Sequence, residues 1–200
     1  MMAHIRILNF LRGRLFALLF AHQFARYGRG TRVIAPVAIE GVERIHLGDG
    51  VLVAAQCCLA AVPHTGATEC RLEIGEGTTL GRFNHIYATR MVRIGRKVLT
   101  ANGVYIADNQ HGFRDPTMAV IDQAIVQLGD VEIGDGSWLG QNVCVIGARI
   151  GKHCVIGANA VVTSDIPDYC VAVGTPARII RRYIPDRGEW VRTDASGSAI

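Results

Sequence analysis

Histidine and cysteine are the residue types in this sequence that could take part in the most kinds of chemistry. Their spacing predicts a structural role for the cysteines and a reactive role for one histidine. The six cysteines include no CxxC pair and no Cys/His cluster at structural-zinc spacing, so we expect reduced thiols packed in the interior. Among the seven histidines, His111 stands apart because it lies in an irregular stretch, residues 108–116, that interrupts a regular pattern. An imidazole is the side chain best suited to accept a proton near pH 7.

The pattern that His111 interrupts is a repeat of six residues. An aliphatic residue recurs at every sixth position in five groups of three, and glycine or alanine usually follows it. Three such units make one triangular coil with the aliphatic side chains inside, and coils stack about 4.8 Å apart. The chain is therefore predicted to be mainly β, a single-stranded parallel β-helix. The recurring positions are Leu47, Val53, Leu59, Ile74, Leu80, Ile86, Ile94, Thr100 (in place of an aliphatic residue), Ile106, Ile133, Leu139, Val145, Ile150, Ile156 and Val162.

The segments outside the repeat set the expected domain organisation. We expect an N-terminal helical segment over residues 1–30, the β-helix over 31–170, and a C-terminal turn, short helix and tail over 171–200. Residues 108–130 form an excursion loop, and long excursions from a solenoid tend to lie on its binding side. The apolar run at residues 15–21 is too short to span a bilayer, so we expect a helix covering the end of the prism, with weak membrane-surface association as an alternative.

Composition and charge exclude two classes of protein. Half of the residues are hydrophobic and the formal net charge is only +4, which is incompatible with disorder. Aromatic residues make up 6% and are not interleaved with the basic ones, so we expect no nucleic-acid partner. The basic residues gather toward the two ends of the chain, where they could meet an anionic ligand or a membrane surface.

The motifs in the second half of the repeat resemble those of the hexapeptide-repeat acyltransferases. The likeness covers roughly residues 45–183, and it is strongest at 133–140 (IGDGSWLG), 145–147, 155–158 and 174–178 (GTPAR). Within the family, the branch of galactoside, maltose, xenobiotic and surface-polysaccharide O-acetyltransferases is the most similar. The resemblance implies a left-handed coil, a homotrimer with active sites between subunits, and acetyl-CoA as co-substrate. The spacing of the cysteines and histidines leads us to expect no metal and a cytoplasmic location, and the N-terminal run allows association with the inner face of the membrane.

The resemblance also assigns roles at the reacting centre. His111 matches the family's general base, which would take the proton of an acceptor hydroxyl as its oxygen attacks the thioester. Asn84 matches an asparagine beside that centre, although asparagine also suits a left-handed corner. The backbone N–H of Gly140 or Gln141 would stabilise the oxyanion. His85 and Asp108 are candidates for the acceptor site, and Asp108 or a backbone carbonyl could orient His111.

Coenzyme A binding is expected along the coils that follow the tryptophan. An aromatic ring would line the pantetheine groove, small residues would leave room for it, and a guanidinium would pair with phosphate. The residues that match the family at these positions are Trp138, Ala158, Thr163, Ser164, Arg178 and Arg181.

The function implied is transfer of acetyl from acetyl-CoA to a sugar hydroxyl. The opening segment differs from the helical segment of the galactoside and maltose enzymes, which favours a surface-polysaccharide or lipopolysaccharide precursor as acceptor. Three alternatives stay open: an N-acetyltransferase of a nucleotide-linked amino sugar, a zinc enzyme similar to γ-carbonic anhydrase, and a prism that serves only as a scaffold.

Overall fold

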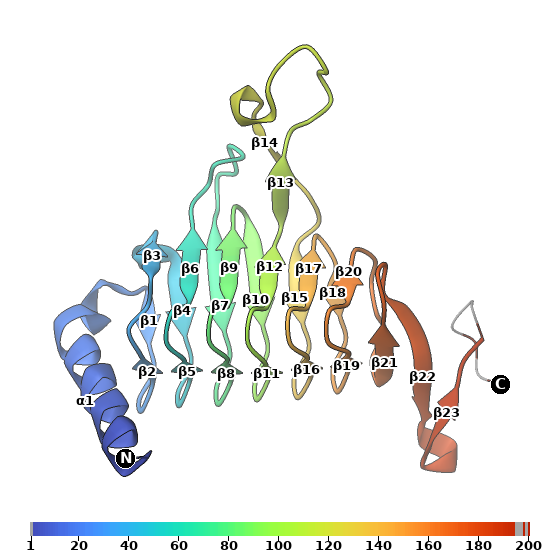
Figure 1. Ribbon diagram of the computed structural model, residues 1–200, viewed down its shortest axis with the longest axis horizontal. Coiled ribbons are helices and arrows are strands. Elements are labelled where there is room, and N and C mark those ends of the chain that lie inside the picture. Colours follow the sequence, from blue (N-terminus) through green and yellow to red (C-terminus); the bar gives the residue numbers. More distant parts are fainter. Residues whose placement is uncertain (1, 195–197, 199) are drawn as a thin grey trace.

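The chain winds into a three-sided prism of stacked coils, and each coil contributes one short strand to each of three sheets (Figure 1). The computed structural model describes residues 2–194, 198 and 200. All pairing between successive coils is parallel, and aliphatic residues face aliphatic residues, as in the column of Leu59, Ile86, Ile106 and Val145. The mainly β, single-stranded parallel β-helix predicted from the repeat is confirmed.

The three faces of the prism are sheets A, B and C. Sheet A consists of β1 (Arg26–Tyr27), β4 (Ile45–Leu47), β7 (Arg71–Ile74), β10 (Met91–Ile94), β15 (Val131–Ile133) and β18 (Arg149–Ile150). Sheet B consists of β2 (Arg32–Val33), β5 (Leu52–Val53), β8 (Thr79–Leu80), β11 (Leu99–Thr100), β16 (Trp138–Leu139), β19 (Val155–Ile156), β21 (Cys170–Val173), β22 (Arg178–Ile184) and β23 (Glu189–Arg192). Sheet C consists of β3 (Ala38–Glu40), β6 (Cys58–Ala61), β9 (His85–Ala88), β12 (Tyr105–Ala107), β17 (Cys144–Ile146) and β20 (Val161–Val162).

The interior of the prism is formed by the residues that the repeat marks. All fifteen predicted inward positions, Thr100 included, are at most 1% exposed. Each fully buried Leu, Ile or Val contributes about 1.5–3 kcal/mol relative to an exposed one, so this column is the main source of stability. The first coil, β1 to β3, precedes the segment in which the repeat is regular. It contributes Val33 to the buried core, and Ile39 packs against that core.

Glycine follows many inward residues because successive coils approach too closely there for a side chain. A Cβ on Gly75 would lie 2.5 Å from the carbonyl carbon of Gly95. A Cβ on Gly134 would lie 2.3 Å from the backbone nitrogen of Lys152. Stacking distance, and not a left-handed backbone, therefore selects glycine at these two positions.

The two ends of the prism are covered differently. Helix α1 (Met2–Phe20) lies against β2 at the first coil, with Phe16 packed on the core and on Phe24. The short 3-10 turn η1 (Ala21–Gln23) connects it to β1. At the other end β22 runs antiparallel to β21, and β23 runs antiparallel to β22 (Figure 1). The 3-10 turn η4 (Pro185–Arg187) joins these two strands.

The predicted short C-terminal helix is wrong, because residues 178–184 form strand β22. The open edge of β21 offers unpaired backbone groups, and the isoleucines and tyrosine of this segment favour a strand that pairs with them. Residues 195–197 and 199 of the predicted tail lie outside the described residues.

Two excursions leave the prism at the corner between sheets C and A. Residues 62–70 connect β6 to β7, and residues 108–130 connect β12 to β15 (Figure 1). The second excursion contains an antiparallel ribbon of β13 (Asn109–His111) and β14 (Ile125–Gln127), with the 3-10 turn η3 (Val120–Asp122) near its tip. A further 3-10 turn, η2 (Val42–Arg44), lies at the same corner of the first coil. No helix among the described residues is long and apolar enough to cross a membrane.

Candidate active site

His111 stands on the ribbon that projects from the prism. It is exposed and pairs with Ile125 across the ribbon. The next residue, Gly112, donates its N–H to the carbonyl of Ala124 at 3.0 Å, and a Cβ on Gly112 would lie 2.7 Å from that oxygen. Among the described residues the His111 imidazole has no hydrogen-bond partner, so its nitrogens are available to a substrate.

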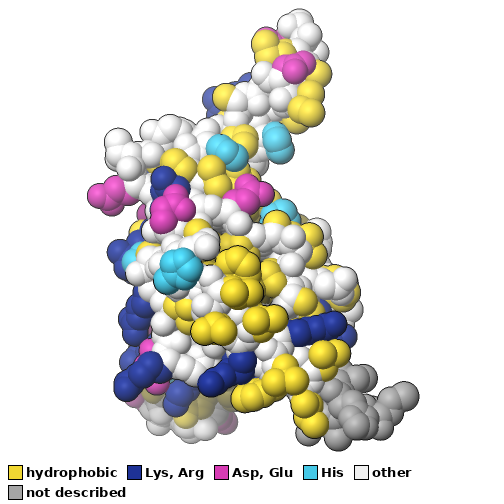
Figure 2. Space-filling model, turned by 90° about the vertical axis from the view of Figure 1, so that its left-hand side faces the viewer, with side chains coloured by type: hydrophobic (Ala, Val, Ile, Leu, Met, Phe, Trp, Pro, Cys, Tyr) yellow, Lys and Arg dark blue, Asp and Glu magenta, His cyan; other side chains and the backbone are white. Residues whose placement is uncertain are grey.

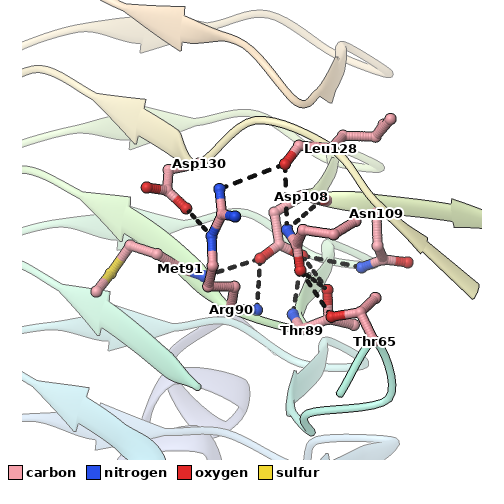
Figure 3. Close-up of polar contacts among 9 residues, drawn as sticks. Thr65, Thr89, Arg90, Met91, Asp108, Asn109, Leu128 and Asp130 are labelled. Atoms are coloured by element: carbon pink, nitrogen blue, oxygen red, sulfur yellow. Dashed lines mark hydrogen bonds and ion pairs between the residues drawn. The ribbon is translucent and has the colours of Figure 1, made fainter. Parts of the chain in front are cut away.

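The base of the ribbon is fixed by the buried carboxylate of Asp108 (Figure 3). One carboxylate oxygen accepts hydrogen bonds from the N–H and hydroxyl of Thr89 at 2.8 and 2.9 Å and from the amide of Asn109 at 3.0 Å. The other accepts from the N–H groups of Arg90 and Met91 at 2.7 and 2.8 Å. Burial alone would raise the pKa of Asp108, but these hydrogen bonds outweigh it and hold the pKa below its usual value.

Gln127 joins this cluster to the first excursion. Its side-chain amide donates to the carbonyl of Asp108 at 2.8 Å, and its side-chain oxygen accepts from Thr89 at 3.0 Å and from Thr65 at 2.8 Å. The N–H of Leu128 also donates to the carbonyl of Asp108 at 2.8 Å, which closes the excursion (Figure 3). The ribbon that carries His111 is therefore tied both to the prism and to residues 62–70.

The expected acceptor role of Asp108 is contradicted by this geometry. Its side chain is 0% exposed and its two oxygens are occupied by neighbours in the chain, so no acceptor can contact it. No contact between Asp108 and the His111 ring is present among the described residues. Asp108 positions the ribbon instead of orienting the imidazole directly.

Asn84 is also buried, against the expectation that it lies beside the reacting centre. It is 1% exposed, and its amide donates to the carbonyls of Gly81 and Ala101 and to the hydroxyl of Thr100, at 2.6, 3.1 and 3.0 Å. Its oxygen accepts from the N–H of Val104 at 2.8 Å. This network explains why Thr100 replaces an aliphatic residue in the repeat, and it assigns Asn84 to the interior of the prism.

Two further side chains near the ribbon were not singled out by the sequence. His64, in the first excursion, hydrogen-bonds the hydroxyl of Tyr87 through Nδ1, and the two rings meet edge to face. The carbonyl of Tyr87 in turn accepts from Asn109, two residues before His111. His64 was passed over because no family motif marks its loop, whereas His111 matches the general base of the family. His85 is exposed on sheet C with its ring edge to face against Tyr105, 5.6 Å between centroids.

The outer face of sheet B carries a row of apolar side chains that ends in arginine. Leu99 and Trp138 are neighbours in register and are both 48% exposed. The row continues through Val155 and Val171 to Arg181 on β22. Arg178, also exposed, pairs with Val173, two residues after Val171 on the same face. The structure therefore brings together the tryptophan and both arginines expected to contact coenzyme A.

The two expected oxyanion donors differ in availability. The N–H of Gly140 donates to the carbonyl of Ile156 at 2.8 Å, as part of the ladder between coils, and Gly140 is buried. Gly140 is therefore excluded as a free donor. Gln141 is exposed, and its N–H has no partner among the described residues.

The other residues expected to bind coenzyme A lie at exposed positions on the next coil. Ala158 stacks directly on Gly140: a Cβ added to Gly140 would lie 2.7 Å from the backbone nitrogen of Ala158. Thr163 and Ser164 follow β20 at a corner. In Figure 1 strand β16, which carries Trp138, lies at the opposite side of the prism from β13, which carries His111. Trp138 and His111 do not meet within one chain.

The cysteines are free thiols, as expected. Burial raises the pKa of Cys57 and Cys154 to about 11, so both stay protonated at neutral pH and serve as small apolar side chains. Within residues 2–194, 198 and 200, no three His, Cys, Asp or Glu side chains gather in a manner that could hold a metal ion.

Comparison with known proteins agrees with this fold. A family described as the hexapeptide repeat of succinyl-transferase matches residues 130–164. A protein of Mycobacterium tuberculosis provisionally named an acetyltransferase is 35% identical over 158 residues, 77% of this chain and 48% of its own length. A protein of Escherichia coli provisionally named the lipopolysaccharide biosynthesis O-acetyl transferase WbbJ is 39% identical over 115 residues, 54% of this chain and 59% of its own.

A solved structure has the same architecture. A variant of AntD, an N-acyltransferase from Bacillus cereus in complex with dTDP and coenzyme A, superposes with a TM-score of 0.70 at 16% identity, over 85% of this chain and 89% of that one. The prism is thus a left-handed β-helix, as expected, and the chain carries the hexapeptide repeat and is similar to proteins named as acetyltransferases. It spans less than two thirds of the length of the two curated relatives.

Proposed function

We propose that the protein transfers an acetyl group from acetyl-CoA to a hydroxyl of a sugar, with His111 as general base. The observation that carries this proposal is the His111 ribbon: an exposed imidazole without an internal partner, on a strand pair fixed to a hexapeptide prism by Asp108. The names of the relatives from M. tuberculosis and E. coli support acetyl transfer. The second name supports a lipopolysaccharide or other surface-glycan precursor as acceptor.

The proposed reaction uses two groups, the imidazole of His111 and the backbone N–H of Gln141. The His111 imidazole takes the proton of the acceptor hydroxyl while its oxygen forms a bond to the thioester carbonyl carbon. The free N–H of Gln141 donates to the oxyanion of the tetrahedral intermediate. When the intermediate collapses, the carbon–sulfur bond breaks and the imidazolium returns its proton to the leaving thiolate. No enzyme-bound acyl group is formed.

Coenzyme A is proposed to lie along the outer face of sheet B. Trp138 and Val155 offer an apolar strip to the pantetheine arm, and Arg181 and Arg178 follow on the same face to pair with phosphate. Ala158, Thr163 and Ser164 border the strip on the next coil. Acetyl-CoA as co-substrate and six free thiols together fit a cytoplasmic protein.

The separation of Trp138 from His111 leads us to propose a homotrimer. A single prism presents its coenzyme A face away from its own ribbon, so His111 must act on coenzyme A that is bound to a neighbouring copy. The exposed apolar row on sheet B is the kind of surface that a neighbour would cover. In such a site His64 and Tyr87 would lie on the acceptor side, because the carbonyl of Tyr87 accepts a hydrogen bond from Asn109 of the ribbon. His85, exposed on sheet C against Tyr105, stays a further candidate for acceptor binding.

The direct test is thiol release from acetyl-CoA with a panel of sugar acceptors. We expect His111→Ala to lower kcat by about 10³-fold, within the range for loss of a general base, while KM for acetyl-CoA stays within about twofold. His22→Ala removes an exposed imidazole from η1 and serves as the matched control. Wild-type turnover in His111→Ala would refute the proposed base. Preference for an amino sugar over every hydroxyl acceptor would instead support N-acetyl transfer.

Shared sites have their own test. Mixed oligomers of His111→Ala and Trp138→Ala chains contain some interfaces in which an intact His111 faces an intact Trp138. Activity of the mixture above that of either variant alone is therefore expected. Light scattering should give a mass of three chains of 21.6 kDa. A monomer with full activity would contradict the shared site.

A further inference from the structure

Helix α1 leaves a long apolar strip without a partner. Ile7, Leu11, Leu15 and Leu18 follow one another at helical spacing, and their exposed fractions are 56%, 56%, 57% and 80%. At 100° per residue, these four side chains lie on one side of the helix. Figure 2 views this end of the molecule and shows a band of hydrophobic side chains with Lys and Arg beside it.

The opposite side of α1 is already occupied by the prism. Gly13 is buried, and a Cβ there would lie 3.3 Å from the Cβ of Arg32. Phe16 packs on the core cluster and on Phe24. The helix is thus held flat against the first coil. Its outward side, which carries the apolar strip and the half-exposed Leu8, Phe10 and Leu19, is left for another partner.

The charge around the strip is of one sign. Arg12 and Arg14 are exposed and, by helical spacing, flank the strip on its two sides. The first 39 residues contain six arginines and no Asp or Glu, and Glu40 is the first acid. Of the arginines of the first coil, Arg26 and Arg29 share the single carboxylate of Asp49.

An apolar strip flanked by arginines on a helix that lies flat matches the boundary between acyl chains and headgroups of a bilayer. Packing of α1 against α1 of a second copy is disfavoured, because it would bring arginines against arginines with no acid between them. We infer that α1 docks the protein onto a membrane surface that carries anionic lipid headgroups. In a cyclic assembly of side-by-side prisms, every α1 faces the same side, so the contacts of all copies add together.

The test is flotation of the whole protein with phosphatidylcholine vesicles, with and without about one third phosphatidylglycerol. We expect the wild type to float with the anionic vesicles and to be released as salt is raised. Leu15→Glu/Leu18→Glu should lower the partition coefficient at least about tenfold, since it places two carboxylates in the strip. Arg12→Gln/Arg14→Gln should lower it about fivefold per arginine on anionic vesicles and much less on neutral ones.

Val120→Glu/Ile121→Glu is the matched control, because it also places two carboxylates at exposed aliphatic positions, 51% and 84% exposed, but on the distant excursion. Its flotation should equal that of the wild type. Equal flotation of the wild type and Leu15→Glu/Leu18→Glu, or no flotation of the wild type, would overturn the inference. So would a lipid-free mass that falls in Leu15→Glu/Leu18→Glu, because α1 would then be an interface between copies.

Both α1 variants change exposed side chains only, so thermal unfolding should match the wild type and show that they fold. The measurement uses neither acetyl-CoA nor an acceptor. Failure of vesicle binding therefore leaves the proposed transfer reaction untouched, and failure of the transfer reaction leaves the docking surface untouched.

Discussion

Two of the buried polar centres of the prism look alike and serve different parts of the molecule. The Asn84 centre joins Asn84 to Thr100 and to backbone groups of neighbouring corners, all inside the stacked coils. The Asp108 centre joins Asp108 to Thr89 and Gln127 at the base of the excursion. Each satisfies every buried donor around it, as an interior requires. The first connects coil to coil, whereas the second connects the prism to the strand pair that carries His111.

The difference teaches that burial alone does not separate structural from functional polar residues. A defect in the Asn84 centre should cost stability and leave the His111 ribbon in place. A defect in the Asp108 centre should cost stability and also release the ribbon. Variants of the two centres, compared for unfolding and for turnover, test this distinction.

Asp108→Ala should have the largest effect. It leaves the buried N–H of Thr89 and the part-buried N–H groups of Arg90 and Met91 without an acceptor, so the free energy of unfolding should fall by about 4 kcal/mol. Turnover per folded molecule should fall at least about tenfold, since the ribbon loses its anchor. Chemical denaturation and initial rates at a temperature where the variant is folded provide the two values. Wild-type turnover in the folded variant would remove the link between this centre and the ribbon.

Asn84→Ala should lower the free energy of unfolding by about 2–3 kcal/mol, because the N–H of Val104 loses its acceptor in the interior. Turnover per folded molecule should stay within about twofold of wild type. Thr100→Val is the companion variant: it restores the aliphatic repeat but removes one acceptor from Asn84, at a cost of about 1 kcal/mol. Loss of turnover in well-folded Asn84→Ala would return Asn84 to the reacting centre.

Gln127→Ala should separate the two excursions with a smaller change in stability, about 1–1.5 kcal/mol. Its side chain bridges Thr65 to the carbonyl of Asp108, so its loss loosens the ribbon without emptying the Asp108 centre. We expect the fractional loss of turnover per folded molecule to exceed the fractional loss of the free energy of unfolding. Hydrogen exchange of residues 109–111 and 125–127 should accelerate in parallel. Unchanged exchange there would mean that Gln127 does not hold the ribbon.

The smallest effect concerns pH. The pKa of Asp108 is depressed in the folded state, so the stability it contributes is fully present above its unfolded pKa, about 3.9, and is lost as pH falls through the lower folded value. The difference in Tm between wild type and Asp108→Asn should therefore be constant above about pH 5 and narrow below about pH 4. A difference that does not change down to pH 3 would show that hydrogen bonding, and not charge, carries the stabilisation.

The period of six predicted the prism because one physical requirement recurs at every inward position. Leu47, Ile106 and Val162 each fill the same kind of site, so local pattern and fold agree. The single polar exception, Thr100, pointed to a buried polar partner, yet the sequence does not say which residue provides it.

The candidate site was predicted less completely, because its geometry depends on contacts that have no period. His111 lies exposed on the ribbon, and Trp138 shares a face with Arg181, which are the positions that their proposed roles require. The burial of Asn84 and Asp108 does not, since hydrogen bonds to neighbouring coils decide it. Strand β22 was mistaken for a helix because its partner, the open edge of β21, exists only once the prism is folded.

The closed base of the 108–130 excursion has a consequence for how such proteins can diversify. The backbone carbonyl of Asp108 accepts hydrogen bonds from the N–H of Leu128 and the side-chain amide of Gln127. The two ends of the excursion are therefore held together whatever sequence lies between them. Lengthening a loop between fixed ends is inexpensive, about 0.6 kcal/mol for each doubling. The tip is thus a part that insertion or exchange can rebuild while the coils and the imidazole stay where they are. A lineage could acquire new acceptors there without having to fold a new protein.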